Sequence, residues 1–381
     1  RWRRGEGREG DEAQRVNGKK MGSAGESLAY IGRVEMIVDA NSGELLSMTS
    51  SGISAAEEAA SLPSDKEVAA YLKTVVDEVN GRLGQVFARS SVTLYGGNYS
   101  NGDVSAQICR RGETNLIALI ADAKKYTAEQ VLAEAGDGLA SFNLKGLPVL
   151  ALQCGGGVRN SISAGDITYR DISNLFINGG TNDGGYYVKA KGKVVWEMIE
   201  WGLSTLTAQD GVTGTISADG STHGRFPVVA GVKYTYDITK PGSTPTKWDG
   251  ISEMTMGSRL TKVVLEDGTE LTKDSERWVV LVISKYEMNG GDNYYCFKNA
   301  KERGELELII ENGSTYAAAT INYLKKLYEK GDIYYPLSSG RIVPESSAYT
   351  KDSFTSVLTL KTAQGALAGQ GFTLEVNEGR G

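Results

Sequence analysis

The sequence has little histidine and cysteine and no long apolar run. Its single histidine, His223, excludes a metal centre built mainly from histidines. The three cysteines, Cys109, Cys154 and Cys296, lie far apart without a CxxC pair, which excludes a zinc ribbon and a redox dithiol. We expect three buried free thiols, with one disulfide plus a free thiol as the alternative. No apolar stretch is long enough to span a bilayer.

The composition is that of an ordinary globular protein with an acidic balance. Its 381 residues, 40% apolar and 23% charged, suffice for one large domain or two ordinary ones with a substantial core. The net charge of -6 argues against a basic nucleic-acid-binding groove. The chain opens at Arg1, without a methionine or a signal peptide, so we expect a cut terminus.

Glycine is abundant and clustered. Many of the 48 glycines stand in short groups, where the backbone turns sharply or approaches another group closely. These groups are Gly155-Gly156-Gly157, Gly179-Gly180, Gly184-Gly185 and Gly290-Gly291. Binding sites are therefore expected near them.

The hydrophobic pattern divides the chain into four parts. Residues 1–27 are charged and nearly free of apolar residues, which predicts a flexible lead-in. Residues 28–63 begin with a strand over 28–38 and continue as a linker. Residues 64–343 form the core domain. Residues 344–381 resemble a linker and the start of an immunoglobulin-like β module, because residues 353–377 are rich in Thr, Val and Leu without a helix.

Helices and strands alternate through the core domain. The strongest helix prediction covers residues 64–86, where apolar residues recur at three- and four-residue spacing, and its apolar stripe is expected to dock on a domain. Further helices are expected over 116–126, 194–206 and 316–330, and strands over 147–152, 226–237, 260–266 and 278–284. This pattern predicts an α+β domain, a mixed sheet with flanking helices, followed by a short all-β segment at the C-terminus.

Four segments carry the most specific signal. They are residues 109–123, residues 155–169 with Gly-Gly-Gly-Val-Arg and Ala-Gly-Asp-Ile-Thr-Tyr, residues 224–237, and residues 289–294. In their order and spacing they resemble the C-terminal, substrate-recognition domain of the 5′-nucleotidase/UDP-sugar hydrolase family. The strand over 28–38 is similar to the last strand of that family's N-terminal metallophosphatase domain.

The resemblance implies a division of labour between two domains. In the family, a two-metal centre in the N-terminal domain activates water, while the C-terminal domain holds the nucleoside and presents the phosphate. With one histidine, this chain is expected to contain no catalytic residue and no metal ligand, and the two divalent metals belong to a missing N-terminal domain. We expect the recognition half of a bacterial 5′-nucleotidase, secreted, periplasmic or at the cell surface, with a nucleotide or nucleoside and that metallophosphatase domain as partners.

The resemblance places ligand-binding residues on the glycine-rich loop and beside it. Arg110 and Arg159 fall where the family holds ribose and phosphate, and guanidinium forks suit both groups. Each arginine could instead cap a carbonyl-rich loop. Gly156 and Gly157 would let the backbone approach a ligand.

Other residues carry a structural interpretation beside the binding one. Asn115 could contact a ligand, but it and Glu113 can equally cap the helix that follows, which we favour. Asp292 either contacts the ligand or shapes a turn. Trp201 lies on a predicted helix and is expected to pack. Amphipathic rim residues are the structural interpretation of Tyr286, Tyr294 and Tyr295.

The family usually holds the base between two aromatic rings, because stacking contributes about 1–3 kcal/mol per base. Tyr294 aligns with the second ring. An ungapped comparison puts Asn178 at the first ring, and a small gap would bring Phe176 there instead. Cys154 replaces the asparagine that opens the glycine loop and so removes an amide that could bond ribose. These departures leave an alternative open, a degenerate non-catalytic domain that self-associates as a structural cell-surface module.

Overall fold

The computed structural model describes residues 14–16, 19–21, 30–59, 63–97, 108–110, 112–176, 180, 184–206, 224–245 and 254–345. The chain divides into two compact units, residues 1–81 and residues 82–381. Residues 346–381 of the predicted immunoglobulin-like segment and most of the predicted lead-in lie outside the described residues.

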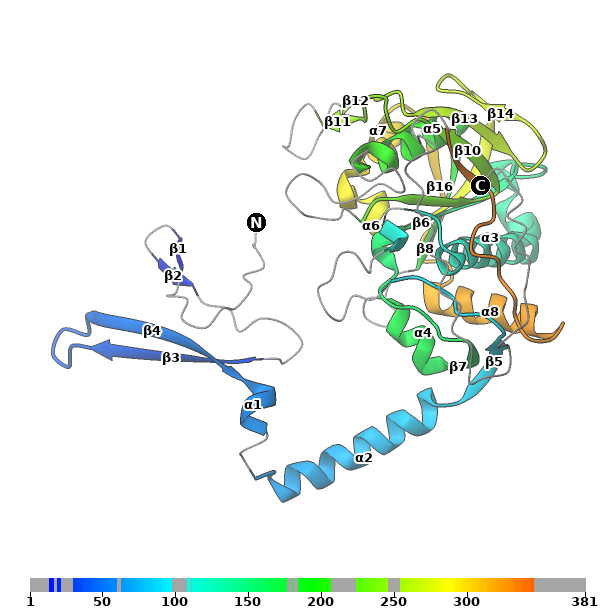
Figure 1. Ribbon diagram of the computed structural model, residues 1–381. Helices are drawn as coiled ribbons and strands as arrows, with labels where there is room; N and C mark the ends of the chain where they lie inside the picture. The colour runs from blue at the N-terminus through cyan, green and yellow to red at the C-terminus, as the bar shows by residue number, and fades with distance from the viewer. Residues whose placement is uncertain are drawn as a thin grey trace, which may run out of the picture. The chain divides into compact units, whose positions relative to one another are not determined.

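The first unit contains two antiparallel hairpins, β1–β2 and β3–β4, and two helices (Figure 1). Its elements are β1 (Gln14–Val16), β2 (Lys19–Met21), β3 (Tyr30–Val38), β4 (Leu45–Ser54), α1 (Ala55–Ala59) and α2 (Lys66–Leu83). Between β3 and β4, the Asp39 carboxylate accepts hydrogen bonds from the backbone N–H groups of Asn41 and Ser42. The predicted strand over 28–38 is confirmed, whereas β4 was not predicted.

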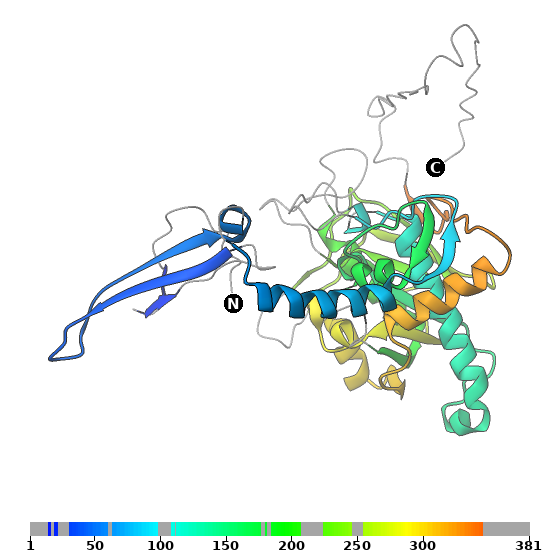
Figure 2. The same ribbon diagram turned by 90° about the horizontal axis from the view of Figure 1, so that it is seen from below.

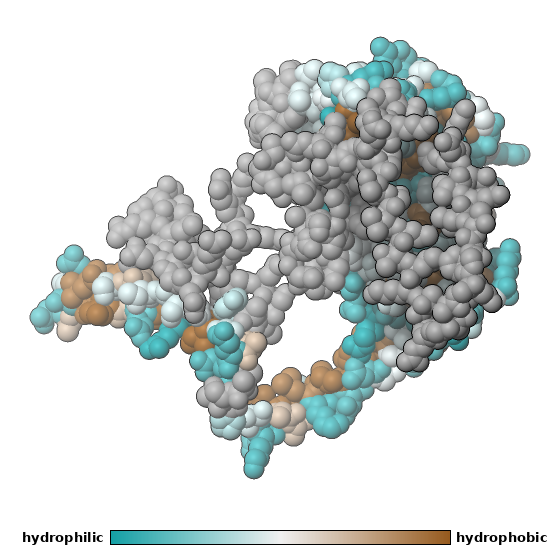
Figure 3. Space-filling model, viewed as in Figure 1, coloured by the Kyte–Doolittle hydropathy of each residue, from teal (hydrophilic) through white to brown (hydrophobic). Residues whose placement is uncertain are grey.

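Helix α2 begins as predicted, and its apolar stripe is not buried within the first unit. Asp65 Oδ1 accepts hydrogen bonds from the backbone N–H groups of Glu67 and Val68, at 2.9 and 3.0 Å. No residue of α2 is buried, and Leu72 is 52% exposed. Figure 3 shows apolar side chains along α2 and along the β3–β4 hairpin. The stripe is that of a helix that packs against a partner surface.

A five-stranded mixed sheet in the order β16-β8-β15-β6-β9 forms the centre of the second unit. Its strands are β6 (Val149–Cys154), β8 (Gly185–Lys191), β9 (Pro227–Ala230), β15 (Trp278–Ser284) and β16 (Leu306–Ile310). Only β6 and β15 run parallel to each other in this sheet, and the other neighbours pair antiparallel. Every residue of β6 from Leu150 to Cys154 is buried, so both faces of the strand are covered. The predicted α+β class is confirmed.

Helices α3, α8 and α5 pack around this sheet. Helix α3 (Asn115–Ala135) contacts β6 and β9, and α8 (Tyr316–Tyr328) lies beside α3 in both views (Figures 1 and 2). Helix α5 (Gly192–Gly202) contacts β8 and β9 and also a smaller sheet in the order β14-β13-β10-β17. That smaller sheet consists of β14 (Glu270–Leu271), β13 (Leu260–Leu265), β10 (Val232–Tyr236) and β17 (Ile342–Pro344).

A buried carboxylate joins α5 to the smaller sheet. Glu200 is fully buried and accepts hydrogen bonds from the backbone N–H groups of Arg259 at 3.2 Å and Leu260 at 2.6 Å. The remaining elements are β5 (Val86–Ser90), β7 (Gly165–Thr168), α4 (Tyr169–Leu175), β11 (Thr244–Pro245), β12 (Met254–Thr255), α6 (Lys285–Met288) and α7 (Tyr295–Glu302). Among the residues given above, no helix combines the length and apolarity that crossing a membrane needs.

Three sequence predictions need correction. The single strand expected over 226–237 is two strands in different sheets, because Gly231 turns the chain at φ +88°, a conformation that favours glycine. Strands β8 and β16 were not predicted. Helix α3 continues to Ala135 instead of ending at Tyr126, because no helix-breaking residue intervenes and Thr127 and Ala128 are buried.

Candidate functional site

The parallel strands β6 and β15 end at the same edge of the large sheet, and both lead into glycine-rich turns. Strand β6 continues into the turn Gly155–Gly157, and β15 continues through α6 into the turn Gly291–Asn293. Strand β9 starts at this edge, since Pro227 pairs with Cys154. Ligands commonly bind outside the carboxyl ends of parallel strands, so this edge is the candidate site.

Backbone packs directly on backbone around the Gly155–Gly157 turn. The Gly156 N–H donates to Gly224 O at 2.6 Å. A Cβ on Gly155 would lie 2.1 Å from Cys109 O, and one on Gly156 would lie 2.7 Å from Gly224 Cα. The close approach of three chain segments therefore requires these two glycines. Gly156 and Gly157 stay partly exposed at the edge.

Arg110 and Arg159 both lie close to this turn. A Cβ on Gly155 would lie 2.8 Å from Arg110 Cα, so Arg110 borders the turn. Arg159 follows the turn, and its backbone N–H donates to Leu175 O at 2.8 Å. Both arginines are partly exposed. The structure thus brings together four predicted binding residues, Arg110, Gly156, Gly157 and Arg159.

Asn115 is placed differently, with its amide turned to protein backbone. It is 1% exposed at the start of α3. Its Oδ1 accepts a hydrogen bond from Tyr95 N–H at 2.7 Å, and its Nδ2 donates to Thr93 O at 2.9 Å. The amide therefore holds the loop around residues 93–97 against the helix in this structure.

The helix cap is Thr114, so the prediction that Asn115 or Glu113 caps α3 is wrong. The Thr114 side chain accepts a hydrogen bond from the backbone N–H of Ile117, three residues on, which is the geometry of an N-cap. The Glu113 carboxylate instead accepts from the Ser339 hydroxyl. It therefore ties the start of α3 to the segment that precedes β17.

The turn after α6 has an unusual backbone conformation. Gly290, Asp292 and Asn293 have φ of +85°, +48° and +62°, and side chains other than glycine rarely adopt such values. Tyr286 OH accepts from Asp292 N–H at 3.2 Å and donates to Asp292 Oδ1 at 3.1 Å. Trp201 Nε1 donates to Asp292 O at 3.1 Å. The structure confirms that Asp292 shapes a turn and that Trp201 packs.

Tyr294, the residue that aligns with the second ring of the aromatic clamp, is fully buried beneath this turn, so the interpretation of Tyr294 as a rim residue is wrong. Its hydroxyl donates to Arg225 O at 2.7 Å and lies 3.6 Å from Cys154 Sγ, and its ring stacks on Phe297. Burial raises the pKa of both the Tyr294 hydroxyl and the Cys154 thiol. All three cysteines are buried and none of them forms a disulfide, as predicted.

Phe176, a candidate for the first ring of the clamp, is also buried. It is 6% exposed and lies 6.0 Å from the Tyr316 ring, centroid to centroid. Asn178, the other candidate, lies outside the described residues. The exposed aromatic side chain at the end of β15 is Tyr286, at 55% exposure, which agrees with its predicted place on a rim.

Arg225 belongs to this edge and was not predicted as a site residue. It is 6% exposed, and its guanidinium carbon lies 4.4 Å from the centroid of the Trp201 ring. A charged residue two positions before the apolar strand β9 was the available signal. Its contact with a helix more than twenty residues earlier in the chain could not be read from the sequence.

Two more ionisable groups are buried beneath the strand ends. Lys124 Nζ donates to Leu152 O at 3.1 Å and lies 3.7 Å from the Tyr316 ring centroid. Glu287 is 8% exposed, and its burial raises the pKa of its carboxyl, although Lys124 opposes that shift. Within the part of the chain that the structure describes, no three His, Cys, Asp or Glu side chains are grouped to hold a metal ion.

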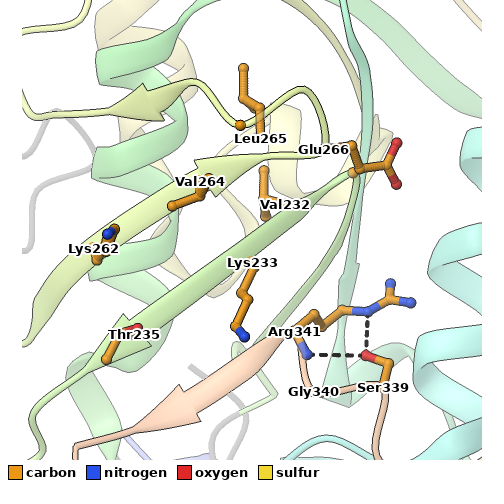
Figure 4. Close-up of a pocket in the computed structure, with 12 residues that line it drawn as sticks. Val232, Lys233, Thr235, Lys262, Val264, Leu265, Glu266, Ser339, Gly340 and Arg341 are labelled. Carbon is orange, nitrogen blue, oxygen red and sulfur yellow. Dashed lines mark hydrogen bonds between the residues drawn. The ribbon is translucent and has the colours of Figure 1, made fainter.

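A separate open hollow of about 720 Å³ lies on the smaller sheet (Figure 4). Lys233, Lys262 and Arg341 contribute its positive charge. Lys262 pairs with Glu270 at 3.6 Å, and Arg341 pairs with Asp122 at 2.8 Å. None of the predicted binding residues lines this hollow, so the strand edge remains the candidate site.

Comparisons with known proteins find matches among nucleotidases and nucleotide phosphoesterases. Residues 87–299 match the family described as 5′-nucleotidase, C-terminal domain. The trifunctional nucleotide phosphoesterase protein YfkN of Bacillus subtilis (strain 168) is 28% identical over 236 residues, which are 61% of this chain and 12% of that protein. A 5′-nucleotidase precursor from Thermus thermophilus is 25% identical with a TM-score of 0.51, over 83% of this chain and 50% of that one.

A putative 5′-nucleotidase from Staphylococcus aureus, solved in complex with alpha-ketoglutarate, shares the fold, with a TM-score of 0.55 at 13% identity over 87% of this chain and 54% of that one. This chain therefore spans about half the length of these solved structures and 12% of the curated relative. The family match covers more than half of the chain and includes all four segments that carried the resemblance. The chain belongs to the 5′-nucleotidase C-terminal domain family.

Proposed function

We propose that this chain is the nucleotide-recognition half of a bacterial 5′-nucleotidase, and that an N-terminal two-metal domain outside this sequence hydrolyses the phosphate monoester. The main support is that residues from four separate segments meet at one sheet edge. They include two partly exposed arginines, Arg110 and Arg159, beside a glycine turn whose backbone is accessible. A secreted, periplasmic or cell-surface location is part of the proposal.

The chemistry available at this edge suits binding rather than bond cleavage. Guanidinium groups can hold phosphate oxygens or ribose hydroxyls through paired hydrogen bonds. Gly156 and Gly157 stay partly exposed, so a ligand can contact their backbone, while their Cβ positions face Gly224 and Gln153. The two metal ions would act in the missing domain, so this half would orient the nucleotide and present its phosphate.

Burial of the aromatic side chains favours a second candidate function. Tyr294 and Phe176 are 0% and 6% exposed, so neither presents a ring face for a base in this structure. The Asn115 amide is likewise engaged by backbone groups. A degenerate domain that no longer binds nucleosides, and that self-associates as a surface module, would have these features.

Calorimetric titration of the purified chain with adenosine and AMP, without metal, separates the two functions. We expect saturable binding that Arg159→Ala weakens about tenfold or more, because charge-assisted hydrogen bonds each contribute about 1.5–3 kcal/mol. Arg277→Ala is the matched control, since Arg277 pairs with Asp267 away from this edge. No heat up to millimolar ligand, together with self-association in analytical ultracentrifugation, would support the degenerate domain.

A further inference from the structure

Arg225 is a buried cation without a carboxylate partner among the described residues. It is 6% exposed. Its Nε has no hydrogen-bond partner among the described residues, and its Nη1 reaches the Ser204 hydroxyl only at 3.5 Å. Within that part of the chain, no carboxylate lies at ion-pair distance from its guanidinium. A buried charge is costly unless an opposite charge and hydrogen bonds compensate it.

Two other arginines of the same unit show how the cost of burying a guanidinium is normally compensated. Arg341 forms two hydrogen bonds with the Asp122 carboxylate, both at 2.8 Å. Arg259 donates to Leu203 O at 2.6 Å and to Lys240 O at 3.0 Å. The Arg225 guanidinium instead lies over the face of the Trp201 ring, 4.4 Å from its centroid. This contact stabilises the charge less than a carboxylate pair does.

The position of Arg225 links it to the candidate site. The preceding residue, Gly224, lies between the glycine turn and the turn after α6, because a Cβ on Gly224 would be 3.0 Å from both Gly156 Cα and Asp292 Oδ2. Gly156, Gly224 and Asp292 are all partly exposed. Burial lowers the pKa of Arg225, while Tyr294 and Asp292 oppose that shift.

We propose that Arg225 is an anion-binding residue of this edge and that it takes a phosphoryl oxyanion, which makes the preferred ligand a nucleotide and not a neutral nucleoside. The inference rests on the proposed function. A guanidinium offers five N–H donors in a fork that matches phosphate oxygens. A phosphoryl group would supply both the negative charge and the acceptors that the guanidinium lacks. The oxyanion could come from a nucleotide or from inorganic phosphate.

The test compares ligands and variants by calorimetry without metal. AMP, adenosine and inorganic phosphate are titrated into the unmodified chain, Arg225→Met and the control Arg259→Met. We expect AMP to bind the unmodified chain at least about tenfold more tightly than adenosine. Arg225→Met should lose this preference while its adenosine affinity stays unchanged, and Arg259→Met should keep the preference. Phosphate binding as tight as AMP binding would identify the free anion as the ligand of Arg225.

Thermal unfolding adds a readout that a structural role would not reproduce. Because no charged partner of Arg225 lies within the described part of the chain, Arg225→Met should melt at the same temperature as the unmodified chain or higher in the absence of anions, whereas Arg259→Met should melt lower. Phosphate should raise the melting temperature of the unmodified chain and of Arg259→Met, and should leave that of Arg225→Met unchanged.

The outcomes separate this inference from the proposed function. A phosphate effect that requires Arg225, without any AMP or adenosine binding, would overturn the proposed function and uphold the anion site. An AMP preference that survives in Arg225→Met, or no anion effect on any variant, would overturn the anion site. If Arg225→Met does not fold, Arg225→Lys replaces it in the test, because lysine keeps the positive charge without the forked guanidinium donors. Undiminished AMP and phosphate affinity in Arg225→Lys would overturn the inference.

Discussion

Similar amphipathic elements expose their apolar side chains in one region of the molecule and bury them in another. The two regions are the described residues between 30 and 81 and those between 82 and 345. In the second region, Leu119 of α3 is fully buried, and so are most residues of β6 and β15. In the first region, Leu72 of α2 is 52% exposed and Met36 of β3 is 63% exposed. Apolar residues recur at helical spacing in both α2 and α3, so the pattern alone did not decide which helix is buried.

This difference indicates which region can be stable by itself. A two-stranded hairpin is at best marginally stable in water, and so is an isolated helix of the 18 residues that α2 has. The second region encloses one continuous core formed by two sheets and several helices. The exposed apolar faces of the first region are those of elements whose packing partner is not within residues 30–81.

Separating the two regions should have the largest effect. We expect a fragment of residues 82–381 to unfold in one cooperative transition within about 4 °C of the full chain, because its core is intact. A fragment of residues 1–81 should show no cooperative transition in circular dichroism. A sharp melting transition in that shorter fragment would contradict the comparison.

The same substitution in each region sharpens the contrast. Leu119→Ala, in α3, should lower the free energy of unfolding by about 2–5 kcal/mol, since it leaves a cavity in the core. Leu72→Ala, in α2, should change it by no more than about 0.5 kcal/mol. Urea denaturation measures both. Equal losses in the two variants would show that a surface covers α2 in solution.

Two carboxylates that each accept two backbone hydrogen bonds form the next pair. Glu200→Ala should lower the free energy of unfolding by about 2–4 kcal/mol, because the N–H groups of Arg259 and Leu260 lose their acceptor inside the protein. Asp65→Ala removes an exposed helix cap and should lower the free energy of unfolding by about 1 kcal/mol or less. A Glu200→Ala cost no larger than that of Asp65→Ala, again by urea denaturation, would argue against a buried anchor.

The smallest expected effect is a pH dependence confined to the buried region. The folded-state pKa of Glu287 lies above its usual value because of burial. The stability that this carboxyl contributes is therefore full below its unfolded pKa of about 4.3 and is lost as pH rises through the folded pKa. Relative to Glu287→Gln, the unmodified chain should lose stability as pH rises from about 4 through the folded pKa, by about 1.4 kcal/mol per unit of difference between the folded and unfolded pKa. Parallel pH profiles for the two proteins would contradict this assignment.

Local signals predicted many of the elements. Helix α8 and strands β6 and β15 were found because each is a strong apolar pattern of the expected length. Strand β8 was missed although it lies between β15 and β16, because Gly185 to Lys191 is short and mixes tyrosine with lysine. The division at Gly231 was also missed, since the apolar residues continue on both sides of it.

The candidate site was partly predictable in the same way. The glycine turn and Arg159 were recognised from a local motif, and the structure places both at the strand edge. Trp201 donates to Asp292, 91 residues away, and no local pattern reports that bond. The burial of Tyr294 likewise depends on its contact with Arg225, 69 residues away.

The amino-acid sequence by itself determined the positions of most helices and strands, the glycines at which segments approach closely, and the resemblance that identified the family. Only the tertiary structure decided that the α2 stripe is exposed, that Tyr294 is buried, and that Arg225 is a buried cation beside a tryptophan. The physical reason is the separation along the chain of the residues that interact. Periodicity and turn conformation depend on neighbours a few residues apart, whereas burial and charge pairing depend on groups that folding brings together from distant parts of the chain.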